Sequence, residues 1–199
     1  MGGRGASSSG GGGNTTLSPT LRAVFGKQGK PQSIDSVLQN TNPNFSTGGT
    51  PYRTNCQRCV YAAELGQRGF DVEALPKADR NTDPFNNGNW RNGFVGQTWE
   101  GNLGNRTAAV ESNIERKMSD WGEGSRAIVY VQWKIGSAHV FNVNNEKGKT
   151  VAYDAQSGRR VSLSNYMSQT KPTATMISRV DNLSTPTDLL QYAVKKRGS

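Results

Sequence analysis

The pattern of hydrophobic and polar residues predicts three amphipathic helices. The first follows Ser33, a good N-cap, and uses the apolar positions of the segment 34–38. The second begins after Asn55, also a good N-cap, and ends before Gly69, a residue type that commonly terminates helices. One face of this helix is formed by residues three or four positions apart, namely Cys56, Val60, Ala63 and Gln67. Cys56 is therefore expected in the first turn of a helix.

The third helix is predicted by Val110, Ile114 and Met118, which recur every four residues and precede the helix-breaking Gly122. Between the helices the chain contains many residues that favour turns. Two segments rich in Asn, Gly, Pro, Thr and Asp are expected to be loops: 41–54 and 77–106.

Strands are predicted mainly in the second half of the chain, where β-branched and aromatic residues are frequent. The clearest segments are 127–133, 138–144 and 149–154, and a shorter strand is expected over 70–75. Weaker signals near the C-terminus predict strands over 161–163 and 175–180 and a closing helix over 187–195. Helices and neighbouring strands in this arrangement predict an α+β fold with an antiparallel sheet.

The second and third strands of that sheet are expected to form a hairpin. If residues 145–148 make a four-residue loop, Asn144 lies opposite Lys149. In this register His139 is directly opposite Asp154, and their side chains share one face of the sheet. The sequence therefore predicts a histidine and a carboxylate within hydrogen-bonding reach.

The two ends of the chain differ in composition from its middle. The first thirteen residues contain seven Gly and three Ser, a composition that buries too little surface to become ordered. We expect residues 1–30 to form a flexible, Gly/Ser-rich basic tail and residues 31–199 to form one domain.

The net charge of +9 is concentrated at the same two ends. Seven of the nine charges belong to the segments 1–30 and 195–197, so a nucleic-acid surface on the folded core is not expected. No apolar run approaches the roughly 18 residues of a membrane span, and no secretory signal is recognised. Two cysteines only three positions apart cannot join distant parts of a fold, which favours a reducing compartment such as the cytoplasm.

The residues that could carry chemistry are a thiol, an imidazole and a carboxylate. A thiol becomes a good nucleophile as a thiolate, which a helix N-terminus and a nearby imidazolium both favour, and Cys56 has the first of these. A carboxylate bound to one ring nitrogen leaves the other free to face the sulfur, and Asp154 can do this for His139. The backbone amide of Cys56 and the side chains of Asn55 and Gln57 are candidates for stabilising an oxyanion.

Several ordered blocks of the sequence resemble a known family. They are the segments 42–44 (NPN), 54–60 (TNCQRCV), 64–74 (ELGQRGFDVEA), 121–126 (WGEGSR), 138–142 (AHVFN) and 154–158 (DAQSG). Together they resemble the papain-fold toxins described as glutamine deamidases, which occur as domains of polymorphic bacterial toxins and of some phage head-associated proteins. One departure is Ala155, where many relatives are expected to have proline, and it concerns the local turn.

The resemblance implies a papain-like cysteine-hydrolase fold, in which an N-terminal nucleophile helix packs on an antiparallel sheet. It implies that Cys56 is the nucleophile, His139 the base, and Asp154 or Gln156 the third member, with acyl transfer through a thioester and no cofactor or metal ion. Deamidation of a protein glutamine is favoured. The alternatives are a cysteine peptidase, acting on a peptide or isopeptide bond, and a non-catalytic virion or interaction module that retains the fold.

The resemblance also implies partners and a place of action. A protein substrate, an inhibitor or immunity protein, and a toxin or phage assembly are expected, without a membrane. The expected place of action is the cytoplasm of a host or target cell, with association to a virion as a further candidate.

The Cys-x-x-Cys spacing leaves other interpretations of the same residues. Cys59 is expected in the core and is the substitute nucleophile if the helix begins later. A structural zinc site would have to recruit Asp154 beside Cys56, Cys59 and His139, which is an uncommon ligand set. A zinc nucleotide deaminase is disfavoured because no glutamate follows His139. A thioredoxin-type redox pair is disfavoured because the segment 50–54 is a poor strand.

Overall fold

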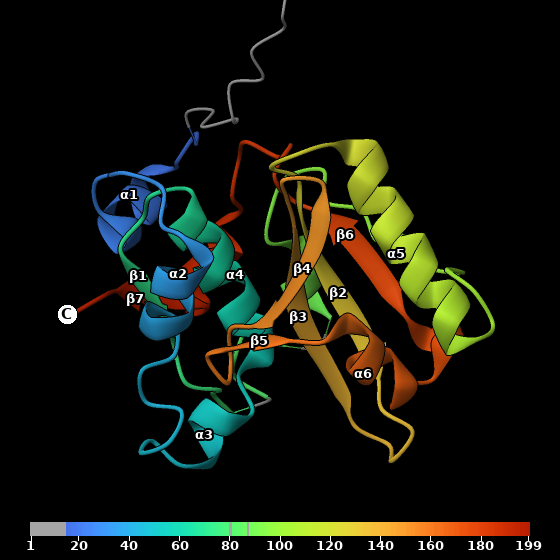
Figure 1. The fold of residues 1–199 in the computed structure, drawn as a ribbon. Helices are drawn as coiled ribbons and strands as arrows, with labels where there is room; N and C mark the ends of the chain where they lie inside the picture. Colours follow the sequence, from blue (N-terminus) through green and yellow to red (C-terminus); the bar gives the residue numbers. More distant parts are fainter. Residues whose placement is uncertain (1–14, 80, 87) are drawn as a thin grey trace, which may run out of the picture.

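The computed structural model describes residues 15–199 except 80 and 87. Figure 1 shows two halves side by side: α1, α2, α4 and the β1–β7 pair form one half, and a sheet with α5 and α6 forms the other. The short 3-10 helices are labelled η. In chain order the elements are α1 (Pro19–Phe25), α2 (Ile34–Asn40), α3 (Thr50–Arg53), α4 (Cys56–Gln67), β1 (Val72–Ala74), η1 (Asn89–Asn92), α5 (Thr107–Trp121), β2 (Arg126–Gln132), β3 (Ala138–Glu146), β4 (Lys149–Asp154), β5 (Arg159–Val161), α6 (Leu163–Ser168), η2 (Pro172–Ala174), β6 (Met176–Arg179), η3 (Asp188–Tyr192) and β7 (Val194–Lys196).

The main sheet is antiparallel and has five strands in the order β5-β4-β3-β2-β6. Its central strands alternate between two hydrophobic clusters, as the two-residue period of a strand requires. Ile128 and Val140 belong to the cluster that includes the buried side of α4. Val129 and Phe141 belong to the cluster that includes the buried residues of α5 and α6. The sheet is thus covered on one face by α4 and on the other by α5 and α6, which confirms the predicted α+β fold (Figure 1).

The helices and strands that carry the predicted chemistry are found close to their expected positions. Ser33 accepts a hydrogen bond from the Ser36 amide at 3.2 Å and caps α2. The helix α4 begins at Cys56, as predicted, and the predicted third helix corresponds to α5. None of the helices formed by residues 15–199, apart from the two positions not described, is long and apolar enough to span a membrane.

The expected flexible segment 1–30 is wrong for residues 15–30. Ser18 caps α1 through a hydrogen bond from the Leu21 amide, and Pro occupies the first turn, where it costs no hydrogen bond. Leu21 and Phe25 are 0% and 1% exposed, and the Phe25 ring packs on Phe70. Two buried apolar side chains one helical turn apart are enough to fix this helix to the core. The expected flexibility of residues 1–14 lies outside the described residues.

The C-terminal segment also differs from its prediction. The expected helix over 187–195 is the short η3 followed by β7, which pairs with β1. Lys195 forms an ion pair with Glu73, and Arg197 forms one with Asp71. The basic residues there are therefore part of a strand pair. Likewise, Leu163 begins α6, because Ser162 caps that helix after β5 has ended.

The hairpin between β3 and β4 is two residues out of the predicted register. Asn145 and Glu146 continue the strand, and Lys147 and Gly148 alone form the turn. Both turn residues have positive φ, of 52° and 79°, as a type I′ turn requires. Glu146 therefore pairs with Lys149, and the predicted direct pairing of His139 with Asp154 is wrong. Because the shift is an even number of residues, both side chains stay on the same face of the sheet.

Candidate functional site

Cys56 and Cys59 have different environments on the same helix. Cys56 is half-buried in the first turn of α4, whereas Cys59 is 0% exposed. Burial, followed by repulsion from Cys56 and Asp154, raises the pKa of the Cys59 thiol well above its usual value. The Cys59 thiol donates a hydrogen bond to Asn55 Oδ1 at 3.3 Å. Cys56 is therefore the accessible thiol, and Cys59 is a core residue.

His139 and Asp154 meet at one end of the sheet, where β3 begins and β4 ends. His139 Nε2 lies 3.4 Å from Asp154 Oδ2 and makes no better-aligned hydrogen bond to any described residue. Since Nε2 faces Asp154, Nδ1 is the ring nitrogen left for the Cys56 thiol. Burial would lower the pKa of His139, but its polar contacts with Asp154 and Cys56 outweigh burial and raise that pKa to about 10. The imidazole is thus protonated at neutral pH.

The Asp154 carboxylate is held by donors from three neighbouring groups. Its Oδ1 accepts from the Gln156 amide at 3.0 Å, and its Oδ2 accepts from the Ser157 hydroxyl at 2.8 Å and the Tyr166 hydroxyl at 3.2 Å. Burial would raise the pKa of Asp154, but His139, the Ser157 hydroxyl and the Gln156 amide lower it. Asp154 is therefore fixed as an anion beside the imidazolium.

Two aromatic side chains enclose the His139 ring. Trp133 stacks on it, with centroids 5.8 Å apart and planes at 20°, and Tyr166 approaches it edge-on at 6.2 Å. Tyr166 also packs against Trp133 and Phe141. This packing leaves the ring little freedom to turn away from Asp154. The sequence prediction missed Trp133 and Tyr166, which stood in no pattern that signals a site, and gave no role to Ser157, although Ser157 lies in the block 154–158.

Asn55 does not act as a side-chain cap or as a free donor, which corrects both expectations. Its Nδ2 donates to Leu75 O at 3.0 Å and to Asn42 Oδ1 at 3.3 Å. Its Oδ1 accepts from Cys59, from Asn42 Nδ2 at 3.3 Å and from Gln156 Nε2 at 3.4 Å. Every hydrogen-bonding position of the amide is engaged, so Asn55 is not available to an oxyanion.

The loop before α4 is tied to the end of β4 through Asn42. Besides its reciprocal bonds with Asn55, Asn42 Nδ2 donates to Tyr52 O and to Gln156 O, both at 2.9 Å. This brings the start of the Cys56 helix against the turn that follows Asp154. Asn42 was part of the sequence resemblance, but no site role could be assigned to it from spacing alone.

The two remaining predicted residues, Gln156 and Gln57, have different surroundings. Gln156 is 8% exposed, and its side chain is directed to Asn55 rather than to His139. Asp154, not Gln156, is therefore the residue that contacts the imidazole. Gln57 is half-buried in the first turn of α4, where backbone N–H groups have no intrahelical acceptor. No described residue hydrogen-bonds the Gln57 side chain, and it remains a candidate donor.

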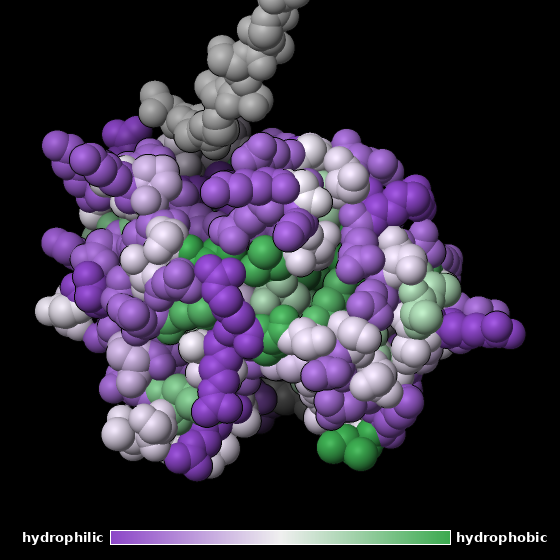
Figure 2. All heavy atoms as spheres, viewed as in Figure 1, coloured by the Kyte–Doolittle hydropathy of each residue, from purple (hydrophilic) through white to green (hydrophobic). Residues whose placement is uncertain are grey.

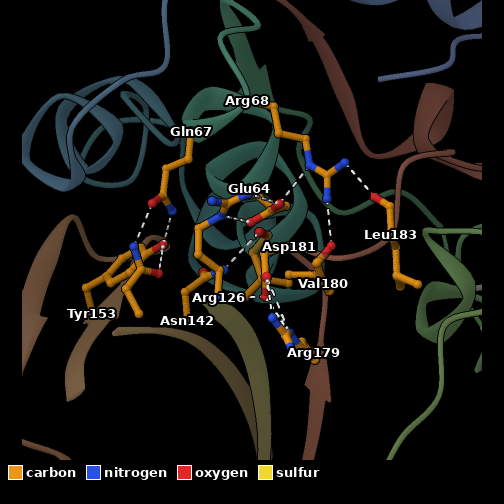
Figure 3. Close-up of polar contacts among 12 residues, drawn as sticks. Glu64, Gln67, Arg68, Arg126, Asn142, Tyr153, Arg179, Val180, Asp181 and Leu183 are labelled. Atoms are coloured by element: carbon orange, nitrogen blue, oxygen red, sulfur yellow. Dashed lines mark hydrogen bonds and ion pairs between the residues drawn. The ribbon is translucent and has the colours of Figure 1, made fainter. Parts of the chain in front are cut away.

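A buried ionic network fixes α4 to the sheet (Figure 3). Glu64 is 0% exposed and accepts from Arg68 Nε at 2.7 Å and from Arg126 Nε at 2.8 Å. These two guanidinium groups lower the pKa of the Glu64 carboxyl against the opposing effect of burial. Arg68 also donates to Val180 O and Leu183 O, both at 2.6 Å. The helix that carries Cys56 is thus held on β2 and on the segment after β6.

Farther along the same helix, Gln67 donates to the Tyr153 hydroxyl and accepts from Asn144 Nδ2 at 2.6 Å, which ties the end of α4 to β3 and β4 (Figure 3).

As for metal ligands, the part of the chain that the structure describes contains no group of three or more His, Cys, Asp or Glu side chains placed to hold an ion.

A helix that begins at a cysteine, packed on an antiparallel sheet that carries a histidine and an acid at its near end, is the arrangement of a papain-like fold. Residues 54–159, more than half of the chain, match the family described as "Papain fold toxin 1, glutamine deamidase". The chain therefore belongs to this family, which confirms the resemblance and the papain fold expected from the sequence. Two further comparisons of the chain, with curated proteins and with solved structures, find no match.

Proposed function

We propose that the protein hydrolyses the side-chain amide of a protein glutamine to glutamate through a thioester on Cys56. The observation that carries this proposal is the meeting of Cys56, His139 and Asp154 at the start of α4, in a chain that belongs to the glutamine deamidase family.

In the first step, the Cys56 thiolate attacks the amide carbon of the glutamine side chain. The N-terminus of α4 and the imidazolium of His139 both favour the anionic sulfur. The tetrahedral intermediate collapses as the carbon–nitrogen bond breaks. His139 gives its Nδ1 proton to the departing nitrogen, so ammonia leaves and the acyl group stays on Cys56 as a thioester.

In the second step, neutral His139 takes a proton from water, and the resulting hydroxide attacks the thioester. The carbon–sulfur bond breaks, glutamate is released, and Cys56 and His139 return to their starting states. Asp154 keeps Nε2 on its own side throughout, which orients the ring and stabilises the imidazolium each time it forms.

The oxyanion of both tetrahedral intermediates needs donors next to Cys56. The backbone N–H of Cys56 and the side-chain amide of Gln57 occupy the first turn of α4, close to the sulfur. We propose that they supply these donors, because the Asn55 side chain is fully engaged elsewhere.

The family supports a protein as the substrate, and we extend this to the expected setting. We propose that the domain acts in the cytoplasm of a target cell and is neutralised by an inhibitor or immunity protein in the producing cell. Reduced thiols at Cys56 and Cys59 are compatible with that compartment. Association with a phage particle belongs to the same proposal.

The test is deamidation of candidate target proteins, measured by mass spectrometry as the mass gain of amide to acid together with release of ammonia. The proposal expects deamidated glutamine with the natural protein and none with Cys56→Ala or His139→Ala. Backbone cleavage that needs the same residues, without deamidated peptides, would show a cysteine peptidase. Neither product from a broad panel would favour a non-catalytic interaction module.

A further inference from the structure

Arg91 differs from the other enclosed arginines in having no acidic partner. Within the described residues, five arginines are buried or half-buried. Four of them form ion pairs with carboxylates: Arg58 with Asp83, Arg68 and Arg126 with Glu64, and Arg179 with Asp181. For Arg91, no carboxylate of a described residue lies within ion-pair distance, and its Nε is buried without a hydrogen bond.

Aromatic rings hold the Arg91 guanidinium in place instead. Its central carbon lies 5.3 Å from the centroid of the Trp90 ring and 5.2 Å from that of Tyr130. These two rings stack on one another with centroids 6.1 Å apart, and Trp99 packs edge-on against Trp90 at 5.2 Å. Trp99 also donates from its indole nitrogen to Arg91 O at 2.9 Å. The guanidinium is therefore positioned by two ring contacts, neither of which neutralises its charge.

The course of α4 along β3 brings its first turn toward the strand position next to this cation. Asn144 contacts Gln67 near the end of the helix, and Asn142 Nδ2 donates to Val60 O at 3.1 Å one turn after Cys56. Toward lower residue numbers, α4 and β3 continue side by side. The first turn of α4 is therefore level with the start of β3, where Val140 faces the helix.

Val140 lies between the first turn of α4 and the aromatic rings that contact Arg91. Val140 pairs with Tyr130 on β2, and both side chains lie in the cluster that also contacts Cys56 and Trp90. The Tyr130 ring, over which Arg91 lies, is thus next to the strand position that faces the first turn of α4.

The same side of α4 carries a half-buried amide, that of Gln57, in its first turn. Tyr61 packs on Phe85 and Phe94, in the segment around η1, and Gln57 lies one helical turn before Tyr61 on that face. Gln57, Arg91 and Tyr130 are all half-buried. A half-buried cation and a half-buried amide therefore lie toward η1 and β2, whereas Asp154 lies on β4, on the other side of β3.

We propose that Arg91 binds a carboxylate of the target, so that the preferred substrate is a glutamine next to an acidic residue. This inference rests on the proposed function, because it adds a subsite to the same reaction. A guanidinium fixed on two rings has lost little freedom when it meets a carboxylate, and it offers the paired donors that a carboxylate accepts. Arg91 acts here as a specificity residue and takes no part in proton transfer.

The experiment uses thiol-alkylating peptides, so that it does not depend on deamidation. Each peptide has an N-terminal bromoacetyl group followed by three residues, with Glu or Gln at the first, second or third position and Gly elsewhere. Cys56 Sγ forms a bond to the acetyl carbon as bromide leaves, and mass spectrometry gives the rate of labelling at Cys56. With the natural protein, labelling by one of the Glu peptides is expected to be about tenfold faster than by its Gln counterpart at low salt.

Two substitutions separate a specific subsite from general attraction of anions. Arg91→Met keeps a long apolar side chain on the rings and is expected to remove the preference for Glu. Lys77→Met removes an exposed cation that lies near the start of α4, two residues after Leu75, and is expected to keep the preference. Thermal unfolding by circular dichroism checks that both variants are folded.

Each outcome bears on the inference. Equal labelling by the Glu and Gln peptides in the natural protein would overturn it, and so would a preference that survives Arg91→Met or disappears equally in Lys77→Met. If Arg91→Met does not fold, Arg91→Gln takes its place, and a preference for Glu that survives this substitution overturns the inference in the same way. A preference for Glu together with no deamidation of any candidate target protein would refute the proposed function and leave the subsite standing.

Discussion

The Tyr166 hydroxyl donates to Asp154 Oδ2, the same oxygen that lies 3.4 Å from His139 Nε2. With the Ser157 hydroxyl, three groups thus share one carboxylate oxygen. Tyr166 stabilises the Asp154 anion and so makes it a weaker proton acceptor toward the imidazolium.

Tyr166→Phe is expected to strengthen the interaction between the Asp154 carboxylate and the His139 imidazolium. The pKa of Asp154 should rise and that of His139 should not fall, because the carboxylate loses a donor. The free energy of unfolding should decrease by about 1 kcal/mol for the lost hydrogen bond. His139 is the chain's one histidine, so nuclear magnetic resonance of its ring reports this pKa without assignment. A fall in the His139 pKa would contradict the expectation.

The pairing of His139 with Asp154 should make stability depend on pH in two windows. The pKa of His139 is raised to about 10, so its contribution is complete below its unfolded value of about 6.5 and disappears as pH rises through 10. The pKa of Asp154 is lowered, so its contribution is present above about 4 and is lost as pH falls through the folded value. Urea unfolding across pH measures both.

Asp154→Asn supplies the control for this pH dependence. Without the anion, only Cys56 opposes the effect of burial, and the His139 ring resonances should titrate below pH 10. Stability should then no longer fall between about pH 7 and 10. An unchanged titration of His139 would mean that Asp154 is not its partner.

Substitution of the two cysteines should separate activity from stability. Cys56→Ala is expected to abolish activity and to change the melting temperature little, because the thiol is half-buried. Cys59→Ala should keep the nucleophile and lower the free energy of unfolding by about 1–3 kcal/mol, since a buried donor to Asn55 is lost. Activity that survives in Cys56→Ala and disappears in a well-folded Cys59→Ala would exchange the two roles.

Asn42→Ala should remove the hydrogen bonds that connect the start of α4 to the end of β4. Loss of its bonds to Tyr52, Asn55 and Gln156 is expected to cost about 1–3 kcal/mol of stability. Labelling of Cys56 by iodoacetamide should slow, because the sulfur is no longer held near His139. Asn44→Ala, two residues away in the same loop, is the matched control and should be neutral in both measurements.

Local patterns predicted most of the elements that carry the site. The N-cap residue types and the four-residue spacing placed α2, α4 and α5, and β-branched residues placed β2, β3 and β4. Cys56 was predicted in the first turn of α4 for the same reason, and the structure places it there. These features depend on neighbours in sequence, which is why sequence alone could predict them.

Features that depend on distant neighbours were not predictable in the same way. The turn at Lys147 and Gly148 lacks the Asn-Gly or Asp-Gly pair that signals a two-residue hairpin, so the loop length was overestimated. His139 and Asp154 still meet, because the error was even and their face was right. The role of Asn55 as a hub could not be seen, since its partners lie 13, 20 and 101 residues away.

The pairing of β1 with β7 has a consequence for how the protein folds. Val72 pairs with Lys196, so the half that contains α4 is closed by a strand from the other end of the described chain. Contacts between such distant residues require a large loop to close before they contribute any stability, which slows folding. The two halves should therefore fold together rather than in succession. Removal of residues 194–199 is expected to abolish the cooperative unfolding transition as a whole, and a truncated protein that still melts in one sharp step would contradict this.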